Sequence, residues 1–221
     1  QRRLYILNKI EGSGVTYNMP FAMKIEGDLD VHQLEKAFHK LIERHEALRT
    51  SFVMVDGEPV QKIEKEIDFQ VTYREMGTNK LDDMINGFVK PFDLEKAPLL
   101  RVEIIHVTDD EHVMVLDMHH IISDGVSMNI LNRELCKLYE GKELSPLDLQ
   151  YKDYAVWQKD LFTQEEMKKQ EEYWINVFKE EVPILNMPTD YKRPPTQSVE
   201  GARRSFEIDS ELTKNLNRIA K

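Results

Sequence analysis

Two adjacent histidines followed by an acid–glycine pair are the residues of this sequence best suited to chemistry. His119 and His120 close an apolar run, and Asp124 and Gly125 follow His120 by four and five residues. An imidazole titrates near neutral pH, so either ring could act as an acid, a base or a hydrogen-bond partner. Because side chains alternate along a strand, the two histidines are expected to face opposite sides and to have different roles.

A metal site is not predicted at this junction. Opposite faces argue against one ion held by both histidines, and no nearby cysteine or third histidine completes a ligand set. Two interpretations remain: both histidines are satisfied core residues, or one of them is a reactive group. Asp124 and Gly125 favour the second, because Asp124 can cap a helix and pair with an arginine. The Gly125 N–H, at a helix start, is where a developing oxyanion could be stabilised.

Hydrophobic periodicity and turn residues predict the elements that position this junction. Strands are expected over residues 19–25, 51–55, 60–63, 69–73, 99–107, 111–121 and 202–208. Helices are expected from about residue 30 to 48, over 79–89, 124–139, 151–162 and 165–181, and from 210 onward. The Asp56–Pro59 segment predicts a tight hairpin turn, and the proline-containing stretch 183–201 predicts a long loop.

Hairpins and helical crossovers interleave irregularly in this order. That pattern predicts a mixed sheet in an α/β sandwich, and not a doubly wound parallel sheet. The length of 221 residues allows one large domain or two small ones.

Several residues are predicted to be buried. On the strand that ends at the histidines, His120 would share a face with Met114, Leu116 and Met118, and burial there would lower its pKa. Further core positions are expected to be Leu48, Phe52, Tyr154 and Trp157, together with Tyr173, Trp174, Val177 and Phe178 on a helix face.

Composition limits the partners. A formal net charge of −10 argues against nucleic acid, and no apolar run is long enough for a membrane helix. Cys136 is the only cysteine, which excludes an internal disulfide and fits a reducing, cytoplasmic location. Its thiol is expected to be buried and inert.

The segment His119–Gly125 resembles the HHxxxDG signature of nonribosomal peptide synthetase condensation domains and of their chloramphenicol acetyltransferase-like relatives. Three further segments resemble motifs of that family in the expected order: Gln1–Tyr5, Arg44–Phe52 and Tyr151–Trp157. A proline-containing loop from Asp190 is also similar, so the resemblance covers essentially the whole chain.

The resemblance implies a chloramphenicol acetyltransferase-like fold and one lobe of a two-lobed domain. Residues 1–201 would form the N-terminal lobe, and residues 202–221 would lead towards a C-terminal lobe that this chain does not contain. The family pattern makes His120 the catalytic histidine and His119 structural. It also implies that Asp124 pairs with Arg49 and holds the loop. The N–H of Gly125, expected from its place at the helix start, would lie at the same centre.

The implied reaction is amide formation between a donor acyl or peptidyl thioester and the amine of an acceptor aminoacyl thioester. Both substrates would arrive on phosphopantetheine arms of donor and acceptor peptidyl carrier proteins, and adenylation domains would be neighbours. No cofactor is expected in the domain itself. His120 could remove the proton, orient the amine or stabilise the charged intermediate, and the sequence leaves these roles open.

Two alternative functions remain. An epimerization domain shares the fold and the histidine motif but uses acid–base chemistry at an α-carbon; the Ser123–Met128 context favours condensation. A noncatalytic lobe that only docks carrier proteins is the second alternative. Within the condensation domains, the Tyr5–Pro20 segment favours the subtype that joins two L-configured residues.

Overall fold

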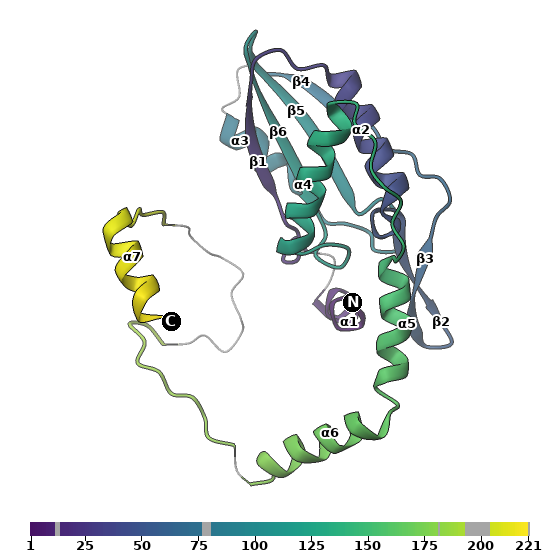
Figure 1. Cartoon of the computed structure of the whole chain (residues 1–221), viewed down its shortest axis with the longest axis vertical. Coiled ribbons are helices and arrows are strands. Elements are labelled where there is room, and N and C mark those ends of the chain that lie inside the picture. Colours follow the sequence, from purple (N-terminus) through teal and green to yellow (C-terminus); the bar gives the residue numbers. More distant parts are fainter. Residues whose placement is uncertain (12–13, 77–80, 181, 193–203, 221) are drawn as a thin grey trace. The chain divides into compact units, whose positions relative to one another are not determined.

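The computed structural model describes residues 1–11, 14–76, 81–180, 182–192 and 204–220 (Figure 1). The chain divides into two compact units, residues 1–180 and residues 181–221. The helices are α1 (Arg2–Glu11), α2 (Val31–Arg44), the 3-10 helix η1 (Glu46–Arg49), α3 (Leu81–Phe88), α4 (Gly125–Tyr139), α5 (Tyr151–Leu161), α6 (Glu165–Val177) and α7 (Ser210–Ile219). The strands are β1 (Phe21–Glu26), β2 (Thr50–Val55), β3 (Glu58–Ile63), β4 (Val71–Glu75), β5 (Leu100–Thr108) and β6 (Glu111–Met118).

The larger unit is organised around a four-stranded sheet in the order β1-β6-β5-β4. The hairpin β5–β6 lies at its centre, β1 adds antiparallel to β6, and β4 adds parallel to β5. Parallel and antiparallel pairs occur in one sheet, so the predicted mixed α/β sheet is confirmed.

Helices α2 and α4 pack side by side on one face of this sheet (Figure 1). The side chain of Asp30 accepts a hydrogen bond from the backbone N of Gln33 at 2.8 Å and so caps α2. The helix then buries Leu34, Ala37, Phe38, Leu41 and Ile42, which recur at helical spacing. These residues join Met114, Leu116 and Met118 of β6 and Leu131, Leu135 and Leu138 of α4 in the main core.

The other sheet face is covered in part by α3. Met84 of α3 packs on Ile105, Val113 and Val115 in a second, smaller core cluster. The central strands therefore bury apolar residues on both faces, as in a sheet that is covered on both sides.

Strands β2 and β3 form a separate hairpin. Its turn residues Asp56 and Gly57 have φ values of 51° and 81°. Both values lie in the left-handed region that a tight hairpin turn requires, so the predicted Asp–Gly turn is confirmed.

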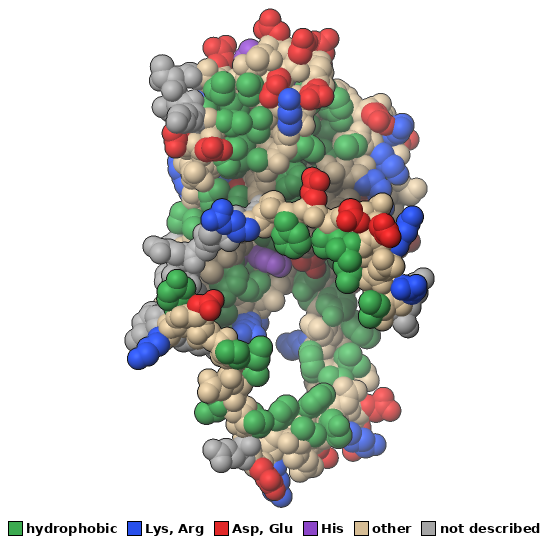
Figure 2. Space-filling view, turned by 90° about the vertical axis from the view of Figure 1, so that its left-hand side faces the viewer, with side chains coloured by type: hydrophobic (Ala, Val, Ile, Leu, Met, Phe, Trp, Pro, Cys, Tyr) green, Lys and Arg blue, Asp and Glu red, His purple; other side chains and the backbone are tan. Residues whose placement is uncertain are grey.

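Helices α5 and α6 depart from the predicted burial. Trp157 of α5 is 56% exposed, and Tyr154 and the predicted packing face of α6 (Tyr173, Trp174, Val177 and Phe178) are also exposed. Figure 2 shows hydrophobic side chains (green) on the surface of the molecule. The predicted core positions of Tyr154 and Trp157 are wrong because nothing among the described residues covers them, whereas Leu48 and Phe52 are buried as predicted.

Three further differences concern single elements. Helix α1 was not predicted, and of its apolar residues Tyr5 alone is fully buried. Cys136 is exposed on α4 rather than buried, because it lies on the side of the helix opposite the stripe of leucines. Of the strand predicted over 202–208, residues 204–208 have no strand and no ladder partner among the described residues, and residues 202–203 lie outside them.

The smaller unit contains α7. Its N-terminus is capped by Asp209, whose carboxylate accepts from the backbone N of Leu212 at 2.8 Å. Residues 182–192, the described part of the predicted proline-containing loop, have no helix or strand.

Candidate active site

Backbone hydrogen bonds from two sides fix the point where β6 ends. The N–H of His119 donates to the Leu99 carbonyl at 3.0 Å, and the N–H of His120 donates to the Tyr17 carbonyl at 2.8 Å. The segment before β1 continues the ladder through Asn18, which bridges to His119. Both histidines therefore leave a rigid strand end and not a free loop.

His119 is a buried and neutral histidine. Its side chain is 1% exposed, and its Nδ1 accepts a hydrogen bond from the backbone N of Ile121 at 3.1 Å. The neutral ring therefore carries its proton on Nε2. Burial, and secondly the proximity of His120, lower its pKa from 6.5 to about 4. The ring also lies edge-on to Phe92, with centroids 6.3 Å apart.

His120 lies on the surface instead. The chain leaves the strand conformation after His119, and His120 lies in a turn with its side chain exposed. The expected burial of His120 beside Met114, Leu116 and Met118 is therefore wrong, because the alternation of β6 stops before His120. Exposure leaves this imidazole open to a reacting group.

Asp124 and Gly125 begin α4. The Asp124 carboxylate accepts from the backbone N of Ser127 at 2.8 Å and from its hydroxyl at 2.7 Å, as an N-cap residue does. These two bonds lower the pKa of Asp124. A Cβ added at Gly125 would meet no atom within 4 Å, so the space above this helix start is open.

The predicted ion pair between Asp124 and Arg49 is wrong in this structure. Arg49 lies 3.6 Å from the Glu46 carboxylate and donates to the Glu64 carbonyl. Glu46 and Arg49 are three residues apart in a 3-10 helix, where the side chains at such positions lie one above the other. Glu46 is therefore close enough to take the Arg49 guanidinium in place of Asp124. Asp124 uses its acceptor capacity on Ser127 instead. The structure thus brings His119, His120, Asp124 and Gly125 together, and Arg49 bonds elsewhere.

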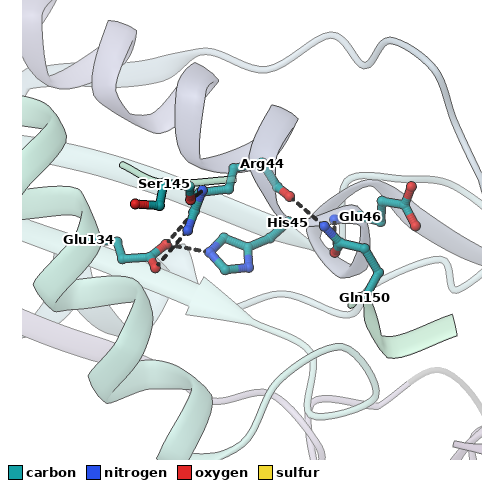
Figure 3. A network of polar contacts seen from close by, with 6 residues as sticks. All are labelled: Arg44, His45, Glu46, Glu134, Ser145 and Gln150. Atoms are coloured by element: carbon teal, nitrogen blue, oxygen red, sulfur yellow. Dashed lines mark hydrogen bonds and ion pairs between the residues drawn. The ribbon is translucent and has the colours of Figure 1, made fainter. Parts of the chain in front are cut away.

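A polar network joins the Arg44–Phe52 segment to α4 (Figure 3). The Glu134 carboxylate lies 2.6 Å from Nε2 of His45 and accepts from Nε of Arg44 at 3.0 Å. Gln150 donates its amide to the Arg44 carbonyl at 3.0 Å and accepts from the Glu46 backbone N at 3.2 Å. The end of α2, the middle of α4 and the start of α5 are thus tied together.

Glu134 was missed by sequence analysis. Burial acts to raise its pKa, but hydrogen bonds from His45 and Arg44 outweigh this and lower the pKa. A signal was present in the sequence: Glu134 falls between Leu131 and Leu135 on the buried stripe of α4. An acidic residue in an apolar stripe needs a partner, here the Arg44–His45 pair.

The described residues contain neither a candidate metal cluster nor a candidate membrane helix. No group of three or more histidine, cysteine, aspartate or glutamate side chains in the described parts of the chain could hold a metal ion. No described helix is long and apolar enough to cross a membrane.

The fold matches those of solved structures. An X-domain from teicoplanin biosynthesis superposes with a TM-score of 0.76 at 28% identity, over 87% of this chain and 45% of that one. A cyclization-docking bidomain of a Sorangium cellulosum synthetase superposes with a TM-score of 0.69 at 23% identity, over 80% of this chain and 36% of that one. The chain thus has the chloramphenicol acetyltransferase-like fold.

The family model for the condensation domain matches residues 1–221. This chain belongs to the condensation-domain family, whose general role is amide-bond formation. It is 63% identical to bacitracin synthase 3 of Bacillus licheniformis and 53% identical to gramicidin S synthase 2 of Brevibacillus brevis, in each case over 100% of this chain. The chain spans 4% and 5% of the length of these two relatives.

Proposed function

We propose that this chain is the histidine-bearing lobe of a condensation domain that joins a donor acyl or peptidyl thioester to the amine of an acceptor aminoacyl thioester. One observation carries the proposal: exposed His120 stands next to buried, neutral His119 at a rigid strand–helix junction, in a chain of this family. The difference in burial supports different roles for the two histidines, and it arises from the end of β6 and not from strand alternation.

The chemistry requires little activation. The acceptor amine has a pKa of about 8, so a useful fraction is neutral near pH 7. Its nitrogen attacks the thioester carbonyl, a C–N bond forms and the C–S bond breaks. The exposed imidazole of His120 takes the proton that the amine loses and returns it to the departing thiolate. The open space above Gly125 would admit the reacting carbonyl to the N–H at the start of α4.

Supporting roles follow from the contacts. His119 is structural, because its Nδ1 is used to fix the turn at Ile121. Asp124 holds the start of α4 as its cap. Arg49 stabilises the Arg44–Phe52 segment through its contacts with the Glu46 carboxylate and the Glu64 carbonyl.

The proposed partners are carrier proteins and a second lobe. Both thioesters would be held on phosphopantetheine arms of donor and acceptor peptidyl carrier proteins, beside adenylation domains of a synthetase in the cytoplasm. Residues 1–201 would be the first lobe and residues 202–221 the lead towards the second. The exposed aromatic residues of α5 and α6 support a second lobe, because an apolar surface of this kind normally has a partner.

The test uses a complete two-lobed domain that contains this lobe, with loaded donor and acceptor carrier proteins in deuterated buffer. We expect a ligated product from the wild type and none from His120→Ala. His32→Ala is the matched control, since His32 is an exposed histidine on α2. Deuterium incorporation at an α-carbon without ligation would indicate epimerization instead, and carrier binding without either reaction would indicate a docking lobe.

A further inference from the structure

A buried carboxylate lies two residues before His119 on β6. Asp117 has a fully buried side chain, on the sheet face opposite α2 and α4, and its Oδ2 lies 3.5 Å from Nε of Arg101 directly across the β5–β6 ladder. The other buried residues of β6 on this face, Val113 and Val115, are apolar. A buried ion pair seldom stabilises a fold more than apolar residues of similar size do, so its presence here calls for another explanation.

Asp117 holds the segment that precedes β1 next to the histidine junction. Its Oδ2 accepts from the amide Nδ2 of Asn18 at 2.7 Å, and the same amide nitrogen donates to the Lys90 carbonyl at 2.8 Å. The backbone of Asn18 bridges to His119, and the preceding Tyr17 carbonyl accepts from His120. The carboxylate therefore fixes the segment that holds both histidine backbones.

Arg101 holds the 90–92 segment next to the same junction. Its Nη2 donates to the carbonyls of Lys90 at 2.7 Å and Pro91 at 3.3 Å, and its guanidinium lies 3.8 Å above the ring of Phe92. Phe92 in turn lies edge-on to His119, with an interplanar angle of 89°. The guanidinium is thus connected through one aromatic ring to the buried histidine.

We propose that Asp117 and Arg101 are positioning residues, which clamp the 17–19 segment and the 90–92 segment against His119 and so set the direction of His120. Neither residue touches the reacting atoms. The inference rests on the proposed function for its kinetic readout, but its structural readout stands without that function.

The chain offers a matched control pair. Glu103 is 2% exposed and pairs with Nη2 of Arg74 at 2.9 Å. Glu103 follows Arg101 by two residues on β5, so it lies on the same face of the sheet. Its cross-strand partner is Val115 and not Asp117. It is a carboxylate–guanidinium pair with an equally buried carboxylate but a more exposed arginine, and it lies one ladder position farther from the histidines.

The experiment compares Asp117→Asn, Arg101→Lys and Glu103→Gln. Asp117→Asn keeps the shape and an acceptor for Asn18 but removes the charge that holds Arg101. Arg101→Lys keeps the charge but loses the flat group over Phe92 and the fork of donors. In the complete two-lobed domain we expect the first to lower kcat about 10- to 100-fold with KM nearly unchanged, because small misplacements of a catalytic group have such costs. We expect Arg101→Lys to lie between Asp117→Asn and the wild type, and Glu103→Gln to match the wild type.

The second readout is NMR of the imidazole nitrogens in the 221-residue chain. We expect Asp117→Asn and Arg101→Lys to shift the His119 and His120 signals and to weaken the Nε2–H tautomer of His119, while Glu103→Gln leaves both rings unchanged. If Asp117→Asn does not fold, Arg101→Lys decides on the same two readouts. Wild-type kcat and wild-type imidazole signals in the folded variants would overturn the inference. A wild-type domain that makes no amide, together with shifted imidazoles in the variants, would refute the proposed function and leave the clamp standing.

Discussion

The histidine junction and the α5–α6 segment both contain aromatic and apolar side chains but use them differently. Around the junction, His119 and Phe92 lie inside a closed core, and every strand there has a neighbour. On α5 and α6 the aromatic residues contact mainly one another, as in the Tyr151–Tyr154–Trp157 row, whose ring centroids lie 5.7 and 5.6 Å apart. The first region is therefore stabilised within this chain, and the second carries an apolar surface suited to a partner.

The largest expected effect is the difference in stability between truncating a buried aromatic residue, Phe38, and truncating an exposed one, Trp157. Phe38, 1% exposed in the main core, is expected to cost about 3–5 kcal/mol when replaced by alanine. Trp157→Ala is expected to change the stability of the 221-residue chain by about 0.5 kcal/mol or less, because its ring is already in water. Urea denaturation of both variants measures the difference.

Addition of the second lobe sharpens this comparison. In the complete domain Trp157→Ala should become clearly destabilising, while the cost of Phe38→Ala stays the same. Equal costs for the two variants in the isolated chain would contradict the assignment of α5 to a partner-facing surface.

The next effect is the pH dependence that His119 brings to the closed region. Its folded pKa of about 4 lies below the unfolded value of 6.5, so the unfolded chain binds more protons between these values. Stability from this group is complete above about pH 6.5 and is lost as pH falls towards 4, by about 3 kcal/mol in all. Denaturation of wild type and His119→Gln at several pH values isolates this contribution. A wild-type curve parallel to that of His119→Gln would show that His119 is not neutral and buried.

A smaller effect is expected at the cap of α4. Asp124→Ala removes both bonds to Ser127 and should cost about 1 kcal/mol, whereas Asp124→Asn should cost less because asparagine also caps helices. Thermal melts of the two variants give the ranking.

If Arg49→Ala and Asp124→Ala show strong coupling in a double-mutant cycle, the two residues do interact, contrary to the contacts described above.

The sequence predicted most of the closed region because local rules govern it. Asp30 and Asp124 cap helices by side-chain bonds within three residues, and Asp56–Gly57 supplies the positive φ values of a turn. The central hairpin follows from alternation and a short connection. Each of these features depends on residues close together in the chain.

The errors concern features set by distant residues. The burial of Trp157 depends on what covers α5, and the partner of Arg49 depends on which carboxylate reaches it first. The exposure of His120 depends on where the ladder with residues 17–19 stops. Glu134, Asp117 and Arg101 were missed because a charged residue in an apolar element shows that a partner exists but does not identify it.

The most direct test of the account is the single-turnover rate of amide formation by the complete two-lobed domain. His120→Ala should lower this rate about 100-fold or more while leaving the melting temperature unchanged, because an exposed acid–base group contributes to the reaction and not to the core. His32→Ala should leave both quantities unchanged. A His120→Ala domain that forms the amide at nearly the wild-type rate would contradict the assignment of His120 as the reactive histidine.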